Sequence, residues 1–263
     1  MMQQSDTKEI VTELDISHLV IEDDTPVDNF QSEEQQRLLV EPLYSSKVLP
    51  LPFLAAANVG LFYKLKGDPI VPDVLLSLGV QRAEDFLQRQ NRSYFVWEFG
   101  KVPEVSIEIV SNREGNELTL SQKAQQEGKN CKKDIYAQIG VPYYVVFDPL
   151  RQIQGKSDMR DALLRVWTIS PVGYTELTAL QGVSTVGEFI WLDGVNLGLT
   201  LWEGQFEEEV TRLWLRWCDR DGLVVPTGAE RADEAESKAQ QAESKAQRLA
   251  ARLEALGINP DEV

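Results

Sequence analysis

The sequence predicts an α/β fold, a mixed β-sheet flanked by helices, with a heptad-repeat helix at the C-terminus. Short β-branched runs come first in the body, a helical stretch follows near residues 119–139, and a further strand-like run comes after it. Strands followed by a helix that crosses back to another strand are typical of a mixed sheet. Three consecutive seven-residue units, AESKAQQ, AESKAQR and LAARLEA, predict the separate helix.

Composition divides the 263 residues into three zones. Residues 1–29 are polar and acidic and predict a mobile leader. Residues 30–228 predict the folded domain, and the hydrophobic fraction of 43% is enough for a well-packed core. Residues 229–263 predict a charged, alanine-rich helical tail.

The elements of the domain follow in order. Residues 31–45 predict a short helix in which Ser32 and Gln35 form a capping box. Residues 119–139 predict a second helix, ended by the Gly-Val-Pro that follows it. The runs LLRVWTIS and GYTELTAL, separated by Pro-Val-Gly, predict a hairpin. The remaining predicted strands are LPFLAAANVGLFYKL, DPIVPDVLLSL, YFVWEF, EVSIEIVS and YYVVFD.

Apolar residues in the tail alternate spacings of four and three, which is the seam of a coiled coil. Alanine at most seam positions buries little area, so residues 235–256 predict weak self-association into a homo-oligomer. A solvated single helix is the alternative interpretation. The seam residues are Ala235, Ala239, Ala242, Ala246, Leu249, Leu253 and Leu256.

A formal charge of −16 is unusual for a protein that binds nucleic acid, which typically has a basic face. Most of the charge lies at the ends, because residues 1–45 carry a net −9 and residues 229–263 a net −3. The body between them is left with −4. Near the second predicted helix, basic side chains outnumber acidic ones. A local basic rim beside an acidic site therefore remains compatible with the composition.

The scarcity of histidine and cysteine excludes several classes of chemistry. His18 is the single histidine, and Cys131 and Cys218 are the only cysteines. Serine–histidine hydrolysis, histidine-rich metal sites and thiolate zinc sites do not fit this inventory. No apolar stretch reaches the roughly 20 residues of a membrane span, and the N-terminus lacks a signal-peptide pattern. We therefore expect a cytoplasmic protein without membrane contact.

Two carboxylates lie in or beside β-branched runs, Asp73 after Pro72 and Glu108 in VSIEIVS. Burying a carboxylate costs several kcal/mol unless a partner compensates it. Their separation of 35 positions along the chain allows an antiparallel return that sets the two side by side. Two carboxylates converging on one hard cation such as Mg2+ would provide the compensation. A solvent-facing glutamate and a turn aspartate are the alternatives for each residue taken alone.

In the second predicted helix, Lys129, Lys132 and Tyr136 recur at spacings of three and four and so share a face. Lys133 lies about a quarter-turn away. A lysine beside two metal-binding carboxylates is typical of phosphodiester hydrolysis, whereas solvated lysines are the ordinary alternative.

The order PDV, VSIEIVS and KKDIYAQIGVPYYVVFDP resembles the Uma-two family of endonucleases, in the PD-(D/E)XK restriction-endonuclease-like superfamily. The resemblance runs from about Val71 to Pro149. It implies a restriction-endonuclease-like core and a metal, Mg2+ or Mn2+, bound by Asp73, Glu108 and the carbonyl of Ile109. It also implies a nucleic-acid partner, DNA in the first place.

One position departs from the superfamily pattern. The superfamily lysine falls two residues after the glutamate, where this chain has Val110. The resemblance implies that the lysine has moved to the helix, as Lys132 with Lys133 second. An additional acid from the first helix would be Glu34 or Glu41.

The sequence therefore predicts a divalent-metal-dependent endonuclease whose catalytic residues are Asp73, Glu108 and Lys132. The alternative is a catalytically inactive protein of the same fold that binds nucleic acid or another protein.

Overall fold

The computed structural model describes residues 15–21, 29–120, 126, 128–155, 158–178, 182–207 and 209–256. Its helices are α1 (Phe30–Ser45), the 3-10 turn η1 (Arg89–Asn91), α2 (Val96–Phe99), α4 (Lys132–Ile139) and α5 (Gly228–Ala255). Its strands are β1 (Phe53–Ala57), β2 (Leu61–Phe62), β3 (Val74–Leu78), β4 (Tyr94–Phe95), β5 (Val105–Ile109), β6 (Tyr143–Phe147), β7 (Leu164–Ser170), β8 (Gly173–Glu176), β9 (Phe189–Leu192), β10 (Leu197–Gln205) and β11 (Thr211–Cys218).

The main sheet has six strands in the order β1-β3-β5-β6-β7-β8. Only β5 and β6 run parallel among the strand pairs of this described sheet, and the others are antiparallel. Parallel neighbours need a crossover connection, and here that connection contains α4. The predicted mixed sheet with a helical crossover is confirmed, as is the hairpin of β7 and β8, in which Ser170 pairs with Gly173.

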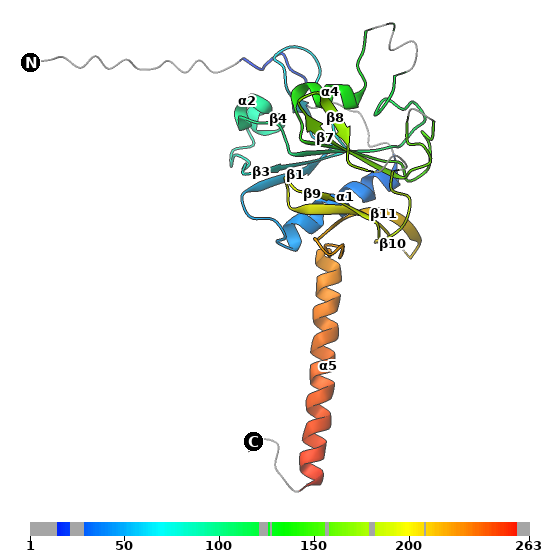
Figure 1. Ribbon diagram of the computed structural model, residues 1–263. Coiled ribbons are helices and arrows are strands. Elements are labelled where there is room, and N and C mark those ends of the chain that lie inside the picture. Colours follow the sequence, from blue (N-terminus) through cyan, green and yellow to red (C-terminus); the bar gives the residue numbers. More distant parts are fainter. Residues whose placement is uncertain are drawn as a thin grey trace, which may run out of the picture.

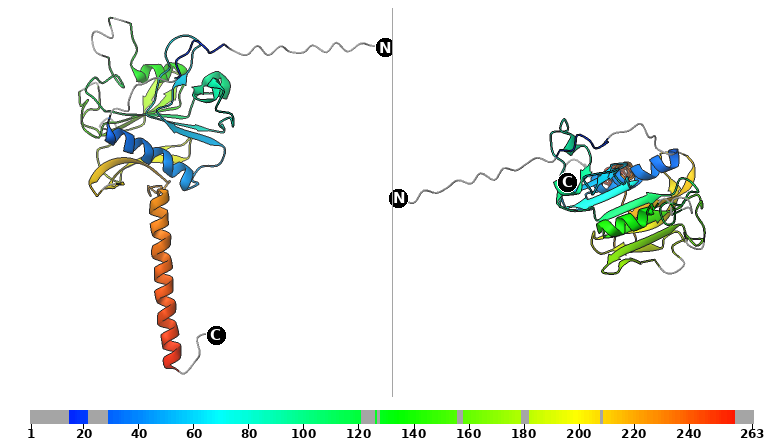
Figure 2. Two further views of the ribbon diagram at one scale, coloured as in Figure 1. Left: turned by 180° about the vertical axis from the view of Figure 1, so that it is seen from behind. Right: turned by 90° about the horizontal axis from the view of Figure 1, so that it is seen from above.

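Helices cover both faces of this sheet (Figure 1). On one face, α1 packs between the sheet and a smaller antiparallel sheet of order β11-β10-β9 (Figure 2). This core contains Leu39 and Leu43 of α1 together with Ile107 of β5 and Trp217 of β11. On the opposite face α4 contributes Tyr136 to a second core. Val105, Ile107 and Ile109 line the first core, so alternate residues of β5 face α1.

The first helix begins one residue earlier than predicted, and its cap is different. Asn29 is the N-cap, and its side chain accepts a hydrogen bond from the backbone N–H of Ser32. The predicted capping box of Ser32 and Gln35 is therefore wrong. Gln35 is fully buried instead, donating from Nε2 to the carbonyl of Leu215 at 2.8 Å and accepting from its N–H at 2.9 Å. This side chain satisfies the open edge of β11.

Two other predicted elements are corrected. In YFVWEF only Tyr94–Phe95 is a strand, because the chain turns into α2 at Val96. The single helix predicted over 119–139 is interrupted, because α4 begins at Lys132. Before it Gln126 is helical, and residues 121–125 and 127 lie outside the described part. Gly128 has a φ of +70° and Cys131 is extended, so Lys129 is not part of α4. The predicted face shared by Lys129, Lys132 and Tyr136 therefore holds only for the last two.

Part of the acidic leader packs on the domain. Ile16 and Leu19 are buried against Phe62 and Phe95, and the ring nitrogen Nε2 of His18 lies 2.8 Å from the carbonyl oxygen of Leu65. The zone boundaries at residues 29 and 228 remain predictions. Among the described residues, no helix is both long and apolar enough to span a membrane.

The tail helix α5 projects away from the domain (Figure 1). Its start is tied to the domain by a capping box, in which Thr227 Oγ1 accepts from the N–H of Glu230 and Glu230 accepts from the N–H of Thr227. The guanidinium of buried Arg216 also binds both carboxylate oxygens of Glu230. Residues 257–263 of the predicted tail lie outside the described part.

Replacing Gln35 by alanine should lower the free energy of unfolding by about 2–3 kcal/mol, because it leaves the buried N–H and carbonyl of Leu215 without their partner. Urea unfolding followed by tryptophan fluorescence measures this change. Gln241→Ala, a matching truncation on an exposed helix, should change stability by less than about 0.5 kcal/mol. Equal effects of the two substitutions would contradict the role given to Gln35.

Candidate active site

Glu108 lies in the centre of the main sheet and is fully buried. Strand alternation turns it toward α4, away from the core that Ile107 enters. There its Oε2 accepts a hydrogen bond from Lys132 Nζ at 2.6 Å and its Oε1 accepts from Tyr136 Oη at 2.8 Å. Lys132 and Tyr136 are four residues apart on α4, so one face of the helix binds both carboxylate oxygens.

Asp73 stands beside Glu108 on the neighbouring strand. Because β3 and β5 pair Val74 with Ile107, the next step of the register sets Asp73 opposite Glu108. Its Oδ2 accepts from the backbone N–H of Ile109 at 2.7 Å, and its Oδ1 accepts from Gln36 Nε2 at 3.0 Å. The side-by-side placement predicted from the spacing is confirmed. Asp73 itself precedes β3 rather than lying within it.

A turn at residues 115–118 fixes the start of α4. The carbonyls of Asn116 and Glu117 accept from the N–H groups of Lys132 and Lys133, at 2.9 and 3.1 Å. The first N–H groups of a helix have no partner within the helix, so this turn supplies one from outside. Tyr144 Oη also donates to the Glu117 carbonyl at 2.9 Å. Lys132 is therefore held over Glu108 by backbone contacts as well as by its own charge.

The choice between the two lysines follows from where each ammonium lies. Lys132 Nζ bonds Glu108, while Lys133 Nζ lies over the ring of Trp167, 5.4 Å from its centroid. Of these two lysines, Lys132 is the one that contacts Glu108. Val110, at the position where the superfamily lysine would stand, is buried in the core beneath α4.

Burial and neighbouring charges shift the pKa values of both members of the Glu108–Lys132 ion pair. Burial raises the pKa of Glu108 to about 8, the adjacent Lys132 ammonium acts against that shift, and Asp73 adds to it. Burial disfavours the charged form of Lys132, yet the Glu108 carboxylate raises the pKa of that amine above its ordinary value. Lys132 thus stays a cation, and Glu108 holds a proton more readily than an exposed glutamate does.

Three functional candidates were not identified from the sequence. Gln36 of α1 binds Asp73 and, through its carbonyl, accepts from Asn58 Nδ2 at 2.7 Å. Glu117 is buried, and its Oε2 has no hydrogen-bond partner among the described residues. Burial raises the pKa of Glu117, and charges on Lys132 and Asp73 act on it as well. All three residues reach the site through long-range packing, which leaves no periodic signal in the sequence.

The two acids considered on the first helix differ in position. Glu41 accepts from the N–H of Gly228 at 3.0 Å, so it binds the start of α5. Glu34 is buried in the first half of α1. The α1 side chain that contacts Asp73 is the neutral amide of Gln36.

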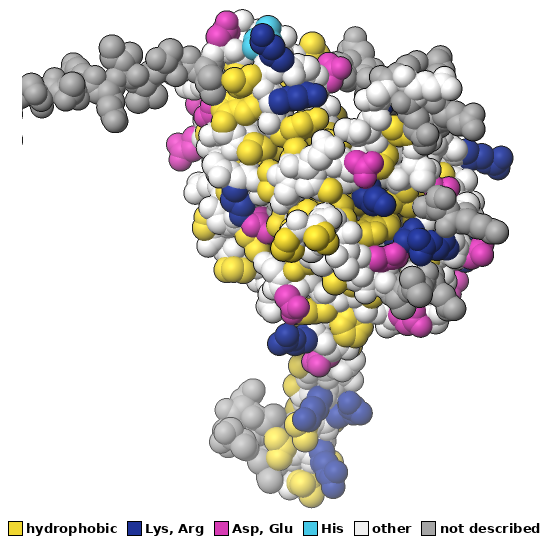
Figure 3. All heavy atoms as spheres, turned by 45° about the horizontal axis from the view of Figure 1, so that its top comes forward, with side chains coloured by type: hydrophobic (Ala, Val, Ile, Leu, Met, Phe, Trp, Pro, Cys, Tyr) yellow, Lys and Arg dark blue, Asp and Glu magenta, His cyan; other side chains and the backbone are white. Residues whose placement is uncertain are grey.

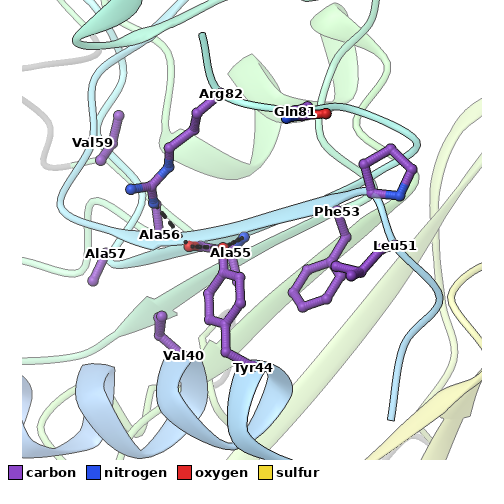
Figure 4. A pocket seen from close by; sticks show the side chains of 11 residues that line it. Val40, Tyr44, Leu51, Phe53, Ala55, Ala56, Ala57, Val59, Gln81 and Arg82 are labelled. Atoms are coloured by element: carbon purple, nitrogen blue, oxygen red, sulfur yellow. Dashed lines mark hydrogen bonds between the residues drawn. The ribbon is translucent and has the colours of Figure 1, made fainter. Parts of the chain in front are cut away.

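A hollow of about 760 Å³ lies beside the edge strand β1 (Figure 4). Tyr44 of α1 reaches into its wall, where its hydroxyl bonds the N–H and carbonyl of Ala55, and Arg82 approaches the same carbonyl at 3.4 Å. The wall is mostly apolar and excludes Asp73, Glu108 and Lys132. It ends at Ala57 and Val59, on either side of Asn58 that contacts Gln36. The hollow therefore adjoins the carboxylate site without containing it.

The donor chemistry fits a hard divalent cation in part. The Asp73 and Glu108 carboxylates are close enough to act on each other electrostatically, and the buried Glu117 is a third acid that interacts with both. In the part of the chain that the structure describes, no three His, Cys, Asp or Glu side chains converge closely enough to hold an ion by themselves. A cation here would need the Ile109 carbonyl and water as further ligands, which is usual for Mg2+.

A central mixed sheet with paired carboxylates at the end of neighbouring strands, and a lysine bound to one of them, defines the restriction-endonuclease-like class of fold. The family profile Uma2, described as "putative restriction endonuclease", matches residues 13–154, more than half of the chain. The chain belongs to this family. The match includes Asp73, Glu108, Ile109 and Lys132. A comparison with curated proteins found no match.

In metal-free buffer the free energy of unfolding should fall as the pH rises from about 4 to about 8. Glu108 has a pKa of about 8 in the fold but about 4.3 in an unfolded chain, so its contribution is complete below the lower value and is lost through the upper one. Urea unfolding at pH 5 to 8 with a chelator measures this. Glu108→Gln should reduce the fall and Glu114→Gln, on an exposed loop, should not. An unchanged pH dependence in Glu108→Gln would contradict the raised pKa.

Proposed function

We propose that the chain is a cytoplasmic, divalent-metal-dependent endonuclease that hydrolyses phosphodiester bonds in DNA. The observation that carries this proposal is the fully buried Glu108, held by Lys132 and placed opposite Asp73. A buried carboxylate costs stability, so a site that retains one with a cationic partner is a candidate for chemistry. Membership of the Uma2 family supports nuclease activity. The divalent metal and DNA as the substrate are our proposals.

A cation bound by Asp73, Glu108 and the Ile109 carbonyl would polarise a phosphoryl oxygen and lower the pKa of a water molecule. The protein groups have separate tasks around it. Ile109 N–H and Gln36 fix the Asp73 carboxylate, and Tyr136 fixes Glu108. Lys132 donates to the attacking water or stabilises the negative charge that grows on the phosphoryl group.

The charge distribution on the surface supports contacts with a phosphate backbone only at local sites. In Figure 3, basic and acidic side chains alternate across the visible face, with no continuous basic patch. Non-specific DNA binding depends on many phosphate contacts. We therefore expect weak binding away from the site and, because few phosphates are contacted, only a modest dependence of that binding on ionic strength.

Asp73→Ala should abolish metal-dependent cleavage, and Lys132→Ala should lower its rate by about 100-fold or more, because each removes a group that contacts the reacting centre. The assay uses supercoiled, linear and single-stranded DNA with Mg2+ or Mn2+. Lys133→Ala is the matched control and should retain activity, since its ammonium lies over Trp167.

Wild-type activity in Asp73→Ala would refute the site. Failure of the wild-type chain to cleave any of these substrates, together with no Mg2+ or Mn2+ binding by calorimetry, would favour the alternative of an inactive nuclease fold that binds nucleic acid or protein.

Glu117→Gln should weaken Mn2+ binding by about 10-fold, because it removes a buried negative charge beside the two carboxylates. Isothermal titration calorimetry of the full chain gives the affinity without any cleavage step. Glu114→Gln, at an exposed position directly before the turn, should bind Mn2+ as the wild type does. Identical affinities for all three proteins would exclude Glu117 from the cation site.

A further inference from the structure

Along most of its length, the projecting helix α5 is covered by no element of the described part of the chain. Every residue from 231 to 249 is exposed, and 28 residues give the helix a length of about 42 Å. Its direction is set at the base by Glu230, which binds Arg216, and by Glu41, which binds the N–H of Gly228. Figure 2 shows that α5 extends away from the domain. Most helices in proteins gain their stability from packing one face, which α5 does not do against the residues that the structure describes.

One line along α5 is apolar and ends in leucines. The seam of alanines from Ala235 to Ala246 continues through Leu249 and Leu253 to Leu256. Leu249 is 53% exposed and Leu256 is 68% exposed. Seam residues spaced by four and three fit a second helix at a shallow crossing angle. The exposed leucines favour such a partner.

The charges beside the seam have opposite signs on its two sides. In the heptad register set by the seam, Arg231, Lys238, Lys245 and Arg252 occupy one flank, while Glu236 and Glu243 occupy the other. In a parallel pair of helices, a residue on the first flank faces the second-flank residue five positions later in the other chain. Lys238 would thus face Glu243, and Arg231 would face Glu236. In an antiparallel pair each flank faces its own kind, so like charges would meet.

We infer that α5 binds α5 of a second copy of this chain, forming a parallel two-stranded coiled coil. The complementary flanks select both the partner and the direction. Because α5 is fixed to its domain by Arg216 and Glu41, a parallel pair places both domains at the same end. Each assembly then carries two copies of the carboxylate site.

Contacts within the monomer limit the strength of this association. Lys238 Nζ bonds Glu234 at 2.6 Å, and Arg231 binds the carbonyl of Ser45. These contacts compete with pairing between chains, and alanine seams bury little area. We expect a dimer in reversible equilibrium with the monomer, more populated at low salt than at high salt.

Charge reversal tests the partner and the orientation together. Sedimentation velocity of the full chain at increasing concentrations should show a monomer–dimer equilibrium. Lys238→Glu and Glu243→Lys should each shift it to monomer by at least 10-fold in dissociation constant. Mixing these two variants in equal amounts should restore the dimer, as should combining both substitutions in one chain. Ser237→Glu and Ser244→Lys, on the opposite side of the helix, should leave the equilibrium unchanged.

Crosslinking gives an independent readout of direction. Ala235→Cys lies near the start of the seam, where only parallel helices bring equivalent residues together, and native Cys131 and Cys218 are buried. Oxidation should yield a covalent dimer through residue 235. A monomeric wild type at all concentrations would overturn the inference, and so would a Lys238→Glu variant that associates more tightly than wild type. Neither readout involves cleavage, so this result is independent of nuclease activity.

Discussion

The fold depends on one requirement, that a carboxylate placed in the middle of a six-stranded sheet has partners for both of its oxygens. Glu108 meets it through Lys132 and Tyr136, which α4 brings to the sheet face together. Without these partners the burial of Glu108 would be strongly unfavourable. The position of α4 is therefore as important to the stability of β5 as the apolar residues that surround it.

Contacts farther from Glu108 also hold the site residues in position. The turn at residues 115–118 provides carbonyls for the first N–H groups of α4 and so sets the height of Lys132 above the sheet. On the opposite side, α1 sends Gln36 to Asp73 and Gln35 to the edge of β11. One helix thus links the carboxylate pair to the smaller sheet, which in turn holds the base of α5 through Arg216.

The sequence predicted the features that follow a short repeat along the chain, which is two residues in a strand and about four in a helix. Glu108 follows the two-residue alternation of VSIEIVS, and the spacing of four between Lys132 and Tyr136 predicted their common face. The start of α4 was misjudged because residues 129–131 continue a polar, helix-compatible pattern, whereas Gly128 adopts a positive φ that ends any regular run. Gln36, Asn58 and Glu117 were missed because their roles depend on contacts between segments far apart in the chain. The catalytic roles of Asp73, Glu108 and Lys132 remain proposals, although the structure brings the three together.

Because the lysine lies on the crossover helix, β5 does not have to hold both the glutamate and the lysine of the site. Val110 is released to fill the core, so β5 and its neighbours pack without accommodating a second charged side chain. Glu108 and Lys132 are 24 positions apart in the sequence, and beyond Ile109 the described residues between them belong to no strand. Insertions and deletions in that connection would leave the strand pairing intact provided that the turn still meets the start of α4. The segment between carboxylate and ammonium is thus the place where this architecture tolerates evolutionary change in length most easily.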